Sequence, residues 1–160
     1  MSFSNDAINA ALGIADGSAL DRLRALRPEF VAGAEACRAA VLTPDEDLGL
    51  SPELRAALGR RVANGGGNAR LVEGYPLPTD PELALLAAGD MPDDPALAAL
   101  ARHSDMIANS AAKAGPQDLA TLQDAGFTVP QIIALSELLA YTCYQIRVAH
   151  GLNLLKEPRP

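Results

Sequence analysis

Aromatic side chains are scarce in this chain of 160 residues, where they make up 4% of the sequence and tryptophan is absent. Hydrophobic residues nevertheless make up 49%, which is enough to bury a core and excludes an intrinsically disordered chain. The core must therefore be built largely from alanine and leucine, and that composition favours closely packed helices. At this length we expect a single domain spanning residues 1–160.

Positive charge is also in short supply. The chain has 13 Lys and Arg residues against 20 Asp and Glu residues, so its formal net charge is -7 and its isoelectric point is about 4.7. This balance argues against nucleic acid and against anionic membrane surfaces as partners. A membrane span is not expected either, because Glu137 and Arg147 interrupt the longest apolar run before it reaches the ~20 residues that a span requires.

Cysteine is limited to Cys37 and Cys143, which are too few to form a disulfide framework. The N-terminal segment has no basic start and carries no export signal, so we expect a protein of the reducing cytoplasm. Alternation of apolar and polar residues with a period of two is missing as well, so no strand is predicted. The expected fold class is therefore all-α, a compact multi-helix bundle with a long buried C-terminal helix.

Helix start and stop signals divide the chain into a series of helices. Ser-Pro and Asp-Pro pairs mark several of the starts, and glycines mark several of the ends. The expected helices cover residues 7–12, 19–26, 29–42, 52–63, 69–75, 81–88, 95–114, 117–125 and 128–155. We divide the domain into a first half, residues 1–78, a second half, residues 79–155, and a tail, residues 156–160.

The stretch 128–155 is predicted to be one long helix at the centre of the fold. Thr128 can cap it, with Gln131 at the third position of a capping box and Pro130 in the first turn. Apolar side chains cover almost its whole circumference, and such a helix belongs inside a structure. The polar residues that interrupt it need partners or a function, because an unpaired buried charge is costly. These residues are Glu137, Gln145, Arg147 and His150.

The same stretch follows the pattern I-x-x-L-S-x-L-I-A-(apolar)-x-x-(aromatic)-Q-x-R-V-x-x-G-L. The positions that fit are Ile133, Leu135, Ser136, Leu139, Ala140, Tyr144, Gln145, Arg147, Val148, Gly151 and Leu152. The pattern resembles the C-terminal helix of two-part proteins in the carboxymuconolactone decarboxylase and alkylhydroperoxidase-D-like superfamily. This resemblance implies the helical fold of that superfamily and an antioxidant, peroxidase-related or peroxiredoxin-like oxidoreductase.

The first half carries a second resemblance to the superfamily, in residues 50–55 and 61–64, but it lacks the residues that do the chemistry. Active members have a Cys-x-x-Cys pair at a helix start, where the dipole lowers a thiol pKa, with a Glu and a His that relay protons. Here residues 65–70 stand where the pair should be, and they contain no cysteine. The expected Glu falls near Arg55 or Ala56, and the expected His is replaced by Gly74 or a neighbour.

The chemistry could instead have moved to the long helix, where Cys143, Arg147 and His150 are spaced by four and three residues and line one face. Cys143 and His150 are about 10.5 Å apart along the axis, which is too far for a direct hydrogen bond. Arg147 lies between them and could lower the pKa of the Cys143 thiol, giving a thiol that attacks a peroxide. Alternatively, Cys143 is a small buried hydrophobe and Arg147 pairs with a carboxylate on another helix.

Other candidate residues admit both a functional and a structural interpretation. Glu137, in a stripe with Tyr141 and Tyr144, is either a proton relay or subunit contact, or a carboxylate held by Tyr hydroxyls or by an Arg. His103 is expected at the surface or in an interface, and two histidines are too few for a metal site without carboxylates, so no metal or other cofactor is expected. The glycine run 65–67 lacks the features of a phosphate loop and is predicted to be a turn.

Three hypotheses for function follow. The first is a redox enzyme with a catalytic site of Cys143, Arg147, His150 and Glu137. The second is a non-catalytic helical scaffold or the partner of a Cys-x-x-Cys-containing relative, and the third is cysteine-independent, decarboxylase-like chemistry on a small molecule. The resemblance also implies a homo-oligomer, a trimer, hexamer or dimer, for which the alanine-rich surfaces of residues 96–101 and 108–114 are candidate contacts.

Overall fold

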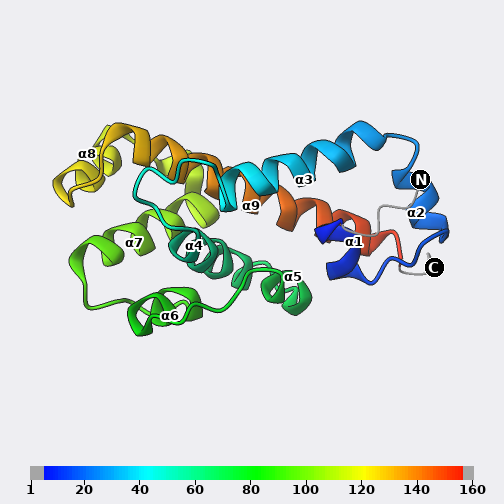
Figure 1. Ribbon diagram of the computed structural model, residues 1–160, viewed down its shortest axis with the longest axis horizontal. Coiled ribbons are helices and arrows are strands. Elements are labelled where there is room, and N and C mark those ends of the chain that lie inside the picture. The colour runs from blue at the N-terminus through cyan, green and yellow to red at the C-terminus, as the bar shows by residue number, and fades with distance from the viewer. Residues whose placement is uncertain (1–5, 157–160) are drawn as a thin grey trace.

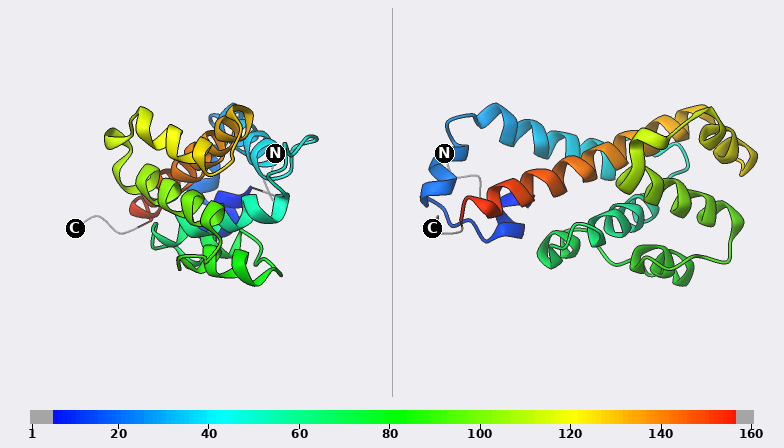
Figure 2. Two further views of the ribbon diagram at one scale, coloured as in Figure 1. Left: turned by 90° about the vertical axis from the view of Figure 1, so that its left-hand side faces the viewer. Right: turned by 180° about the vertical axis from the view of Figure 1, so that it is seen from behind.

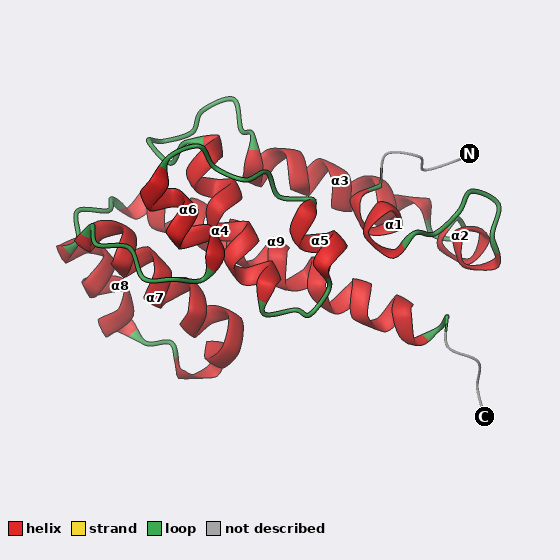
Figure 3. Ribbon diagram, turned by 90° about the horizontal axis from the view of Figure 1, so that it is seen from below, coloured by secondary structure: helices red, strands yellow, loops and turns green. Residues whose placement is uncertain are grey.

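The computed structural model of the chain describes residues 6–156, and every regular element in that range is a helix (Figure 3). The all-α prediction is therefore confirmed. The elements are α1 (Ala7–Leu12), α2 (Ala19–Arg24), α3 (Pro28–Leu42), α4 (Pro52–Asn64), α5 (Ala69–Glu73), α6 (Pro81–Ala88), α7 (Pro95–Ser110), the 3-10 helix η1 (Ala111–Lys113), α8 (Pro116–Asp124) and α9 (Val129–Leu154).

The predicted helix starts are accurate because the capping chemistry is local. Ser51, Asp80 and Asp94 each accept a hydrogen bond from the backbone N–H three residues on, and each is followed by a proline at the first helical position. Helix ends were predicted less well. The helix expected to reach residue 114 gives way to η1 after Ser110. Residues 1–5 of the predicted lead and residues 157–160 of the predicted tail lie outside the described part.

The long helix α9 is the axis of the fold, as predicted. Its capping box is formed, with Thr128 N donating to Gln131 Oε1 over 2.8 Å and Gln131 N donating to Thr128 Oγ1 over 3.4 Å. Figures 1 and 2 show α3 along one side of α9 and the α4–α7 segment along the other. The molecule is longest along α9, with α8 near one end and α1 and α2 near the other (Figure 1). None of the described helices, α9 included, has the length and apolarity to cross a bilayer.

Alanine and leucine build most of the core, as the composition predicted. The main cluster joins α4, α6, α7 and α9 to the end of α3, and its most enclosed members include Ala57, Leu58, Ala63, Leu86, Ala87, Leu100, Ala101, Leu135, Leu138 and Leu139. A smaller cluster attaches α1 to α5 and to the C-terminal part of α9 through Ile8, Ala11, Leu12, Ile14, Leu71 and Ala149. Both clusters close against α9, so this helix holds the two ends of the molecule together.

A polar network crosses the core beside α9 and explains one of the polar residues in that helix. Tyr75 Oη donates to Gln145 Oε1 over 2.7 Å, and Gln145 Nε2 donates to Tyr141 Oη over 3.2 Å. Gln145 thus has buried partners at both ends of its amide, as the sequence required. Helix α4 admits the Tyr75 ring because residue 59 is glycine: a Cβ there would lie 2.4 Å from Tyr75 Cε1.

Two predictions about buried surfaces were wrong. Helix α9 is not covered all round, because an exposed stripe that includes Ile133, Ala140 and Tyr144 runs along one face. The alanine-rich surface of residues 96–101, expected to contact another subunit, is not free. Four of its members pack inside the chain's own core: Ala98, Ala99, Leu100 and Ala101.

Candidate functional site

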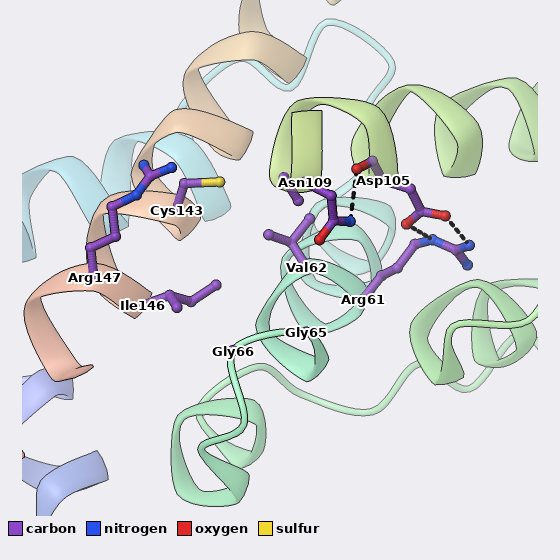
Figure 4. Close-up of a pocket in the computed structure, with 10 residues that line it drawn as sticks. Arg61, Val62, Gly65, Gly66, Asp105, Asn109, Cys143, Ile146 and Arg147 are labelled. Atoms are coloured by element: carbon purple, nitrogen blue, oxygen red, sulfur yellow. Dashed lines mark hydrogen bonds and ion pairs between the residues drawn. The ribbon is translucent and has the colours of Figure 1, made fainter. Parts of the chain in front are cut away.

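A small pocket around Cys143 contains two of the predicted site residues, Cys143 and Arg147. Gly65 and Gly66, from the segment where the resemblance expects a Cys-x-x-Cys pair, also line it. It has a volume of about 190 Å³ and lies between α4, α7 and α9 (Figure 4). We call it the Cys143 pocket. Its lining residues are Arg61, Val62, Gly65, Gly66, Asp105, Ala108, Asn109, Cys143, Ile146 and Arg147. Figure 4 shows Cys143 and Arg147 projecting from α9 on one side, with Arg61, Asp105 and Asn109 on the other.

The wall opposite Cys143 is fixed by a closed set of hydrogen bonds. Arg61 forms two parallel contacts with Asp105, Nε to Oδ1 and Nη2 to Oδ2, each 2.8 Å long. Arg61 Nη1 also donates to the carbonyl oxygens of Leu86 and Asp90, over 3.2 and 2.6 Å. The guanidinium of Arg61 therefore already bonds the Asp105 carboxylate and two backbone carbonyls. These bonds join α4, α6 and α7, so we assign Arg61 a structural role and not a role in binding a substrate.

Cys143 itself is not an activated thiol. Its side chain is buried, at 8% exposure, and this burial raises the pKa of the thiol above its ordinary value. Arg147 acts in the opposite direction and lowers the pKa, as the helical spacing predicted, but its effect is the smaller of the two. The thiol is therefore protonated at neutral pH, and a protonated thiol is a poor nucleophile.

The four residues predicted to form the site do not share one cavity. Cys143 and Arg147 line the Cys143 pocket, while His150 is exposed and lines a separate hollow beside α5. Glu137 is exposed on the face of α9 that also carries Arg147, but it lines the groove between α9 and α3 and not the Cys143 pocket. The carboxylate partner expected for Arg147 is not found within residues 6–156, where Arg147 forms no ion pair.

Residues 65–70, where the resemblance expects a Cys-x-x-Cys pair, contain the start of α5. Asn68 caps α5, its Oδ1 accepting from Leu71 N over 3.1 Å, and α5 begins at Ala69. Gly66 touches α9 so closely that a Cβ at that position would lie 2.8 Å from Ile146 Cγ2. A side chain at position 66 would therefore require Ile146 to move.

A second pocket, between α3 and α4, was not predicted from the sequence. It has a volume of about 510 Å³ and is lined by Glu35, Arg38, Ala39, Leu42, Thr43, Pro52, Glu53, Ala56, Gly74, Pro76 and Leu77. The resemblance expects an acid near Arg55 or Ala56 and a histidine at Gly74 or a neighbour, and both Ala56 and Gly74 line this pocket. The sequence offered one signal, the proline-rich stretch Tyr75-Pro76-Leu77-Pro78, which is expected to be a rigid connector. Its exposed Leu77 lines the pocket.

Two residues near these sites have structural roles that differ from expectation. His103 is buried rather than exposed, and burial lowers the pKa of its imidazole, with Asp118 acting against that shift. Arg55, one of the two positions near which the resemblance expects a Glu, is also buried. Its guanidinium donates to the carbonyl oxygens of Leu50, Val41 and Asp47 over 2.7, 3.0 and 2.9 Å, so it fixes the loop between α3 and α4.

Comparison with known proteins supports the fold. No protein-family model matches the chain, and no curated protein matches it. The chain is similar to a crystal structure described as an alkylhydroperoxidase AhpD core, an uncharacterized peroxidase-related protein from Ralstonia eutropha JMP134. The TM-score is 0.56 and the sequence identity 20%, over 79% of this chain and 70% of the other. The chain therefore has an AhpD-like helical fold, as its sequence pattern predicted.

Proposed function

We propose that the chain is a thiol-inert variant of the AhpD-like fold that serves as a helical scaffold subunit in the cytoplasm. The observation that carries the proposal is the state of Cys143, a buried thiol whose pKa is raised. Attack on a peroxide needs a thiolate, whose sulfur bonds to one peroxide oxygen as the O–O bond breaks. The sulfur becomes a sulfenic acid, and the other oxygen leaves with a proton as an alcohol. The protonated Cys143 does not provide that thiolate.

The absence of a resolving thiol supports the same conclusion. Turnover requires a second sulfur that condenses with the sulfenic acid to give a disulfide and water. Cys37 is the other cysteine of the sequence, and it is exposed on α3, where it lines the groove between α3 and α9 and not the Cys143 pocket. We therefore propose that this chain shares the fold of its peroxidase-related structural neighbour but not a peroxidase activity.

A peroxide-consumption assay tests this proposal. Purified wild type, Cys143→Ser and Cys37→Ser are each incubated with tert-butyl hydroperoxide and a dithiol reductant. We expect all three proteins to consume peroxide at the rate of buffer alone, because the Cys143 thiol is buried and its pKa is raised. Consumption by the wild type that is lost in Cys143→Ser, with far-UV circular dichroism unchanged, would contradict the proposal and support the redox hypothesis with Arg147 as activator.

Cysteine-independent binding of a small molecule is the second candidate, and the pocket between α3 and α4 favours it. The pocket is large enough for a compact organic molecule, and aliphatic side chains make up much of its wall. This candidate does not conflict with a scaffold role. A scaffold partner is either another copy of the chain, in a dimer, trimer or hexamer, or a Cys-x-x-Cys-containing relative.

A further inference from the structure

The exposed stripe of α9 is apolar at most positions, and none of residues 6–156 covers it. Its members recur every three or four residues, the spacing of a coiled-coil seam, and all are exposed. They are Ile133, Glu137, Ala140, Tyr144, Arg147 and Gly151. We call this set the α9 stripe. A helix face of this composition is normally packed against another element.

The neighbouring face of α3 continues this surface. Its outward residues carry no charge after the first turn, where Glu29 pairs with Arg27. The exposed ones that line the groove beside α9 are Phe30, Gly33, Cys37 and Ala40. An open groove of about 650 Å³ runs between α3 and α9, with Phe30 and Tyr144 among its lining residues. Figure 2 shows α3 and α9 meeting near the C-terminal end of α3 and diverging toward its start.

We propose that this surface binds a second copy of the chain in a two-fold contact, with the two α9 helices antiparallel. The proposal rests on the scaffold role and names the surface through which that role is exerted. A two-fold axis passing beside residue 142 places each member of the α9 stripe opposite another member. Residue 133 then faces residue 151, residue 137 faces residue 147, and residue 140 faces residue 144.

The pairs made by this register are complementary in size. Ile133 faces Gly151, where a Cβ would meet no atom within 4 Å and space is open. Ala140 faces Tyr144, so the large ring of each copy lies over the small side chain of the other. Large residues that meet small ones allow two helices to approach to the usual packing distance of about 8–10 Å.

The pairs are also complementary in charge. Glu137 of one copy faces Arg147 of the other, and the two-fold axis makes this ion pair twice. Neither residue forms an ion pair within residues 6–156, so both are available. On a chain with a net charge of -7, two copies repel each other at most relative orientations. Contact through a face that is neutral overall avoids that repulsion.

The size of the surface is at the lower limit for a specific pair. From Ile133 to Gly151 the stripe is about 27 Å long, and α3, about 22 Å long, adds a second row of about 10 Å width beside it. The footprint is therefore about 490 Å² for each copy and roughly 1,000 Å² for the pair, which is the size that specific interfaces need.

Sedimentation velocity of the full chain at about 10–100 μM tests the proposal with a charge-swap cycle. We expect the wild type to have the mass of two copies, or of an even multiple. Glu137→Arg and Arg147→Glu should each weaken the pair about tenfold, because each places like charges opposite one another twice. The double variant Glu137→Arg/Arg147→Glu restores opposite charges and should recover the dissociation constant of the wild type.

Two alanine-to-glutamate variants distinguish this surface from the other exposed alanine-rich surface, at residues 111–114. Ala140→Glu, at the proposed axis, should give monomers, while Ala112→Glu on η1 should leave the mass unchanged. Both positions are exposed, so neither change disturbs the core. A monomeric or trimeric wild type, dissociation by Ala112→Glu but not by Ala140→Glu, or no recovery in the double variant would each overturn the proposal. None of these results bears on peroxide consumption, so the scaffold surface and the inert thiol are tested separately.

Discussion

At the scale of single residues, the hydroxyl of Tyr75 donates the first hydrogen bond of the buried polar network. It donates to Gln145, whose amide then donates to Tyr141, and burial raises the pKa of both tyrosine hydroxyls. Both tyrosines therefore stay protonated over the whole physiological range. The sequence indicates that Gln145, a polar residue in an apolar helix, needs hydrogen-bond partners. Its partner Tyr75 could not be predicted, because the two residues are 70 positions apart in the chain.

The Tyr75→Phe change tests this network. It leaves Gln145 Oε1 without its 2.7 Å donor in a buried site, so we expect the free energy of unfolding to fall by about 1–3 kcal/mol. Urea denaturation followed by circular dichroism gives the value. Tyr144→Phe is the matched control, because Tyr144 is exposed, and its cost should stay within about 0.5 kcal/mol. Equal costs for the two variants would show that the network does not stabilise the fold.

At the scale of elements, the helix boundaries illustrate what local sequence can predict. A capping side chain followed by proline specifies a start within four residues, so the starts of α4, α6, α7 and α9 were predicted to within a residue. The open face of α9 could not be predicted in this way. Periodicity indicates that a helix face is apolar. It does not indicate whether other segments of the chain pack against that face.

Arg55 shows how one side chain can hold a connection between elements. Its three hydrogen bonds to backbone carbonyls organise residues 43–51 between α3 and α4. Arg55→Leu removes these donors and leaves three carbonyls to find other partners, so we expect a loss of about 2–4 kcal/mol in the free energy of unfolding. Limited proteolysis should also cut this loop faster than in the wild type.

Arg60→Leu is the control for this prediction, since Arg60 is only partly buried and bonds the carbonyls of Val72 and Tyr75 in a different connection. It should leave the 43–51 loop as resistant as in the wild type. Unchanged proteolysis of that loop in Arg55→Leu would mean that the loop is held by its backbone alone.

At the scale of the whole molecule, the chain has an AhpD-like arrangement of helices. The residues considered for thiol chemistry, Cys143, His150 and Glu137, line three different hollows of that arrangement. The helical spacing correctly placed Arg147 beside Cys143, but it did not tell which face of α9 is buried, and burial is the factor that dominates the thiol pKa. The pocket between α3 and α4 was missed because it depends on how two helices and a connector meet. Each of these failures concerns contacts between distant segments, which a single sequence records only weakly.

The pKa of the Cys143 thiol is the quantity on which the account depends most. It can be measured in the Cys37→Ser variant by following thiolate absorbance at 240 nm as the pH is raised, with a short cysteine peptide as reference. The account predicts a midpoint above that of the peptide, because burial outweighs the effect of Arg147. A midpoint below neutral pH, with a thiolate already present at pH 7, would contradict it.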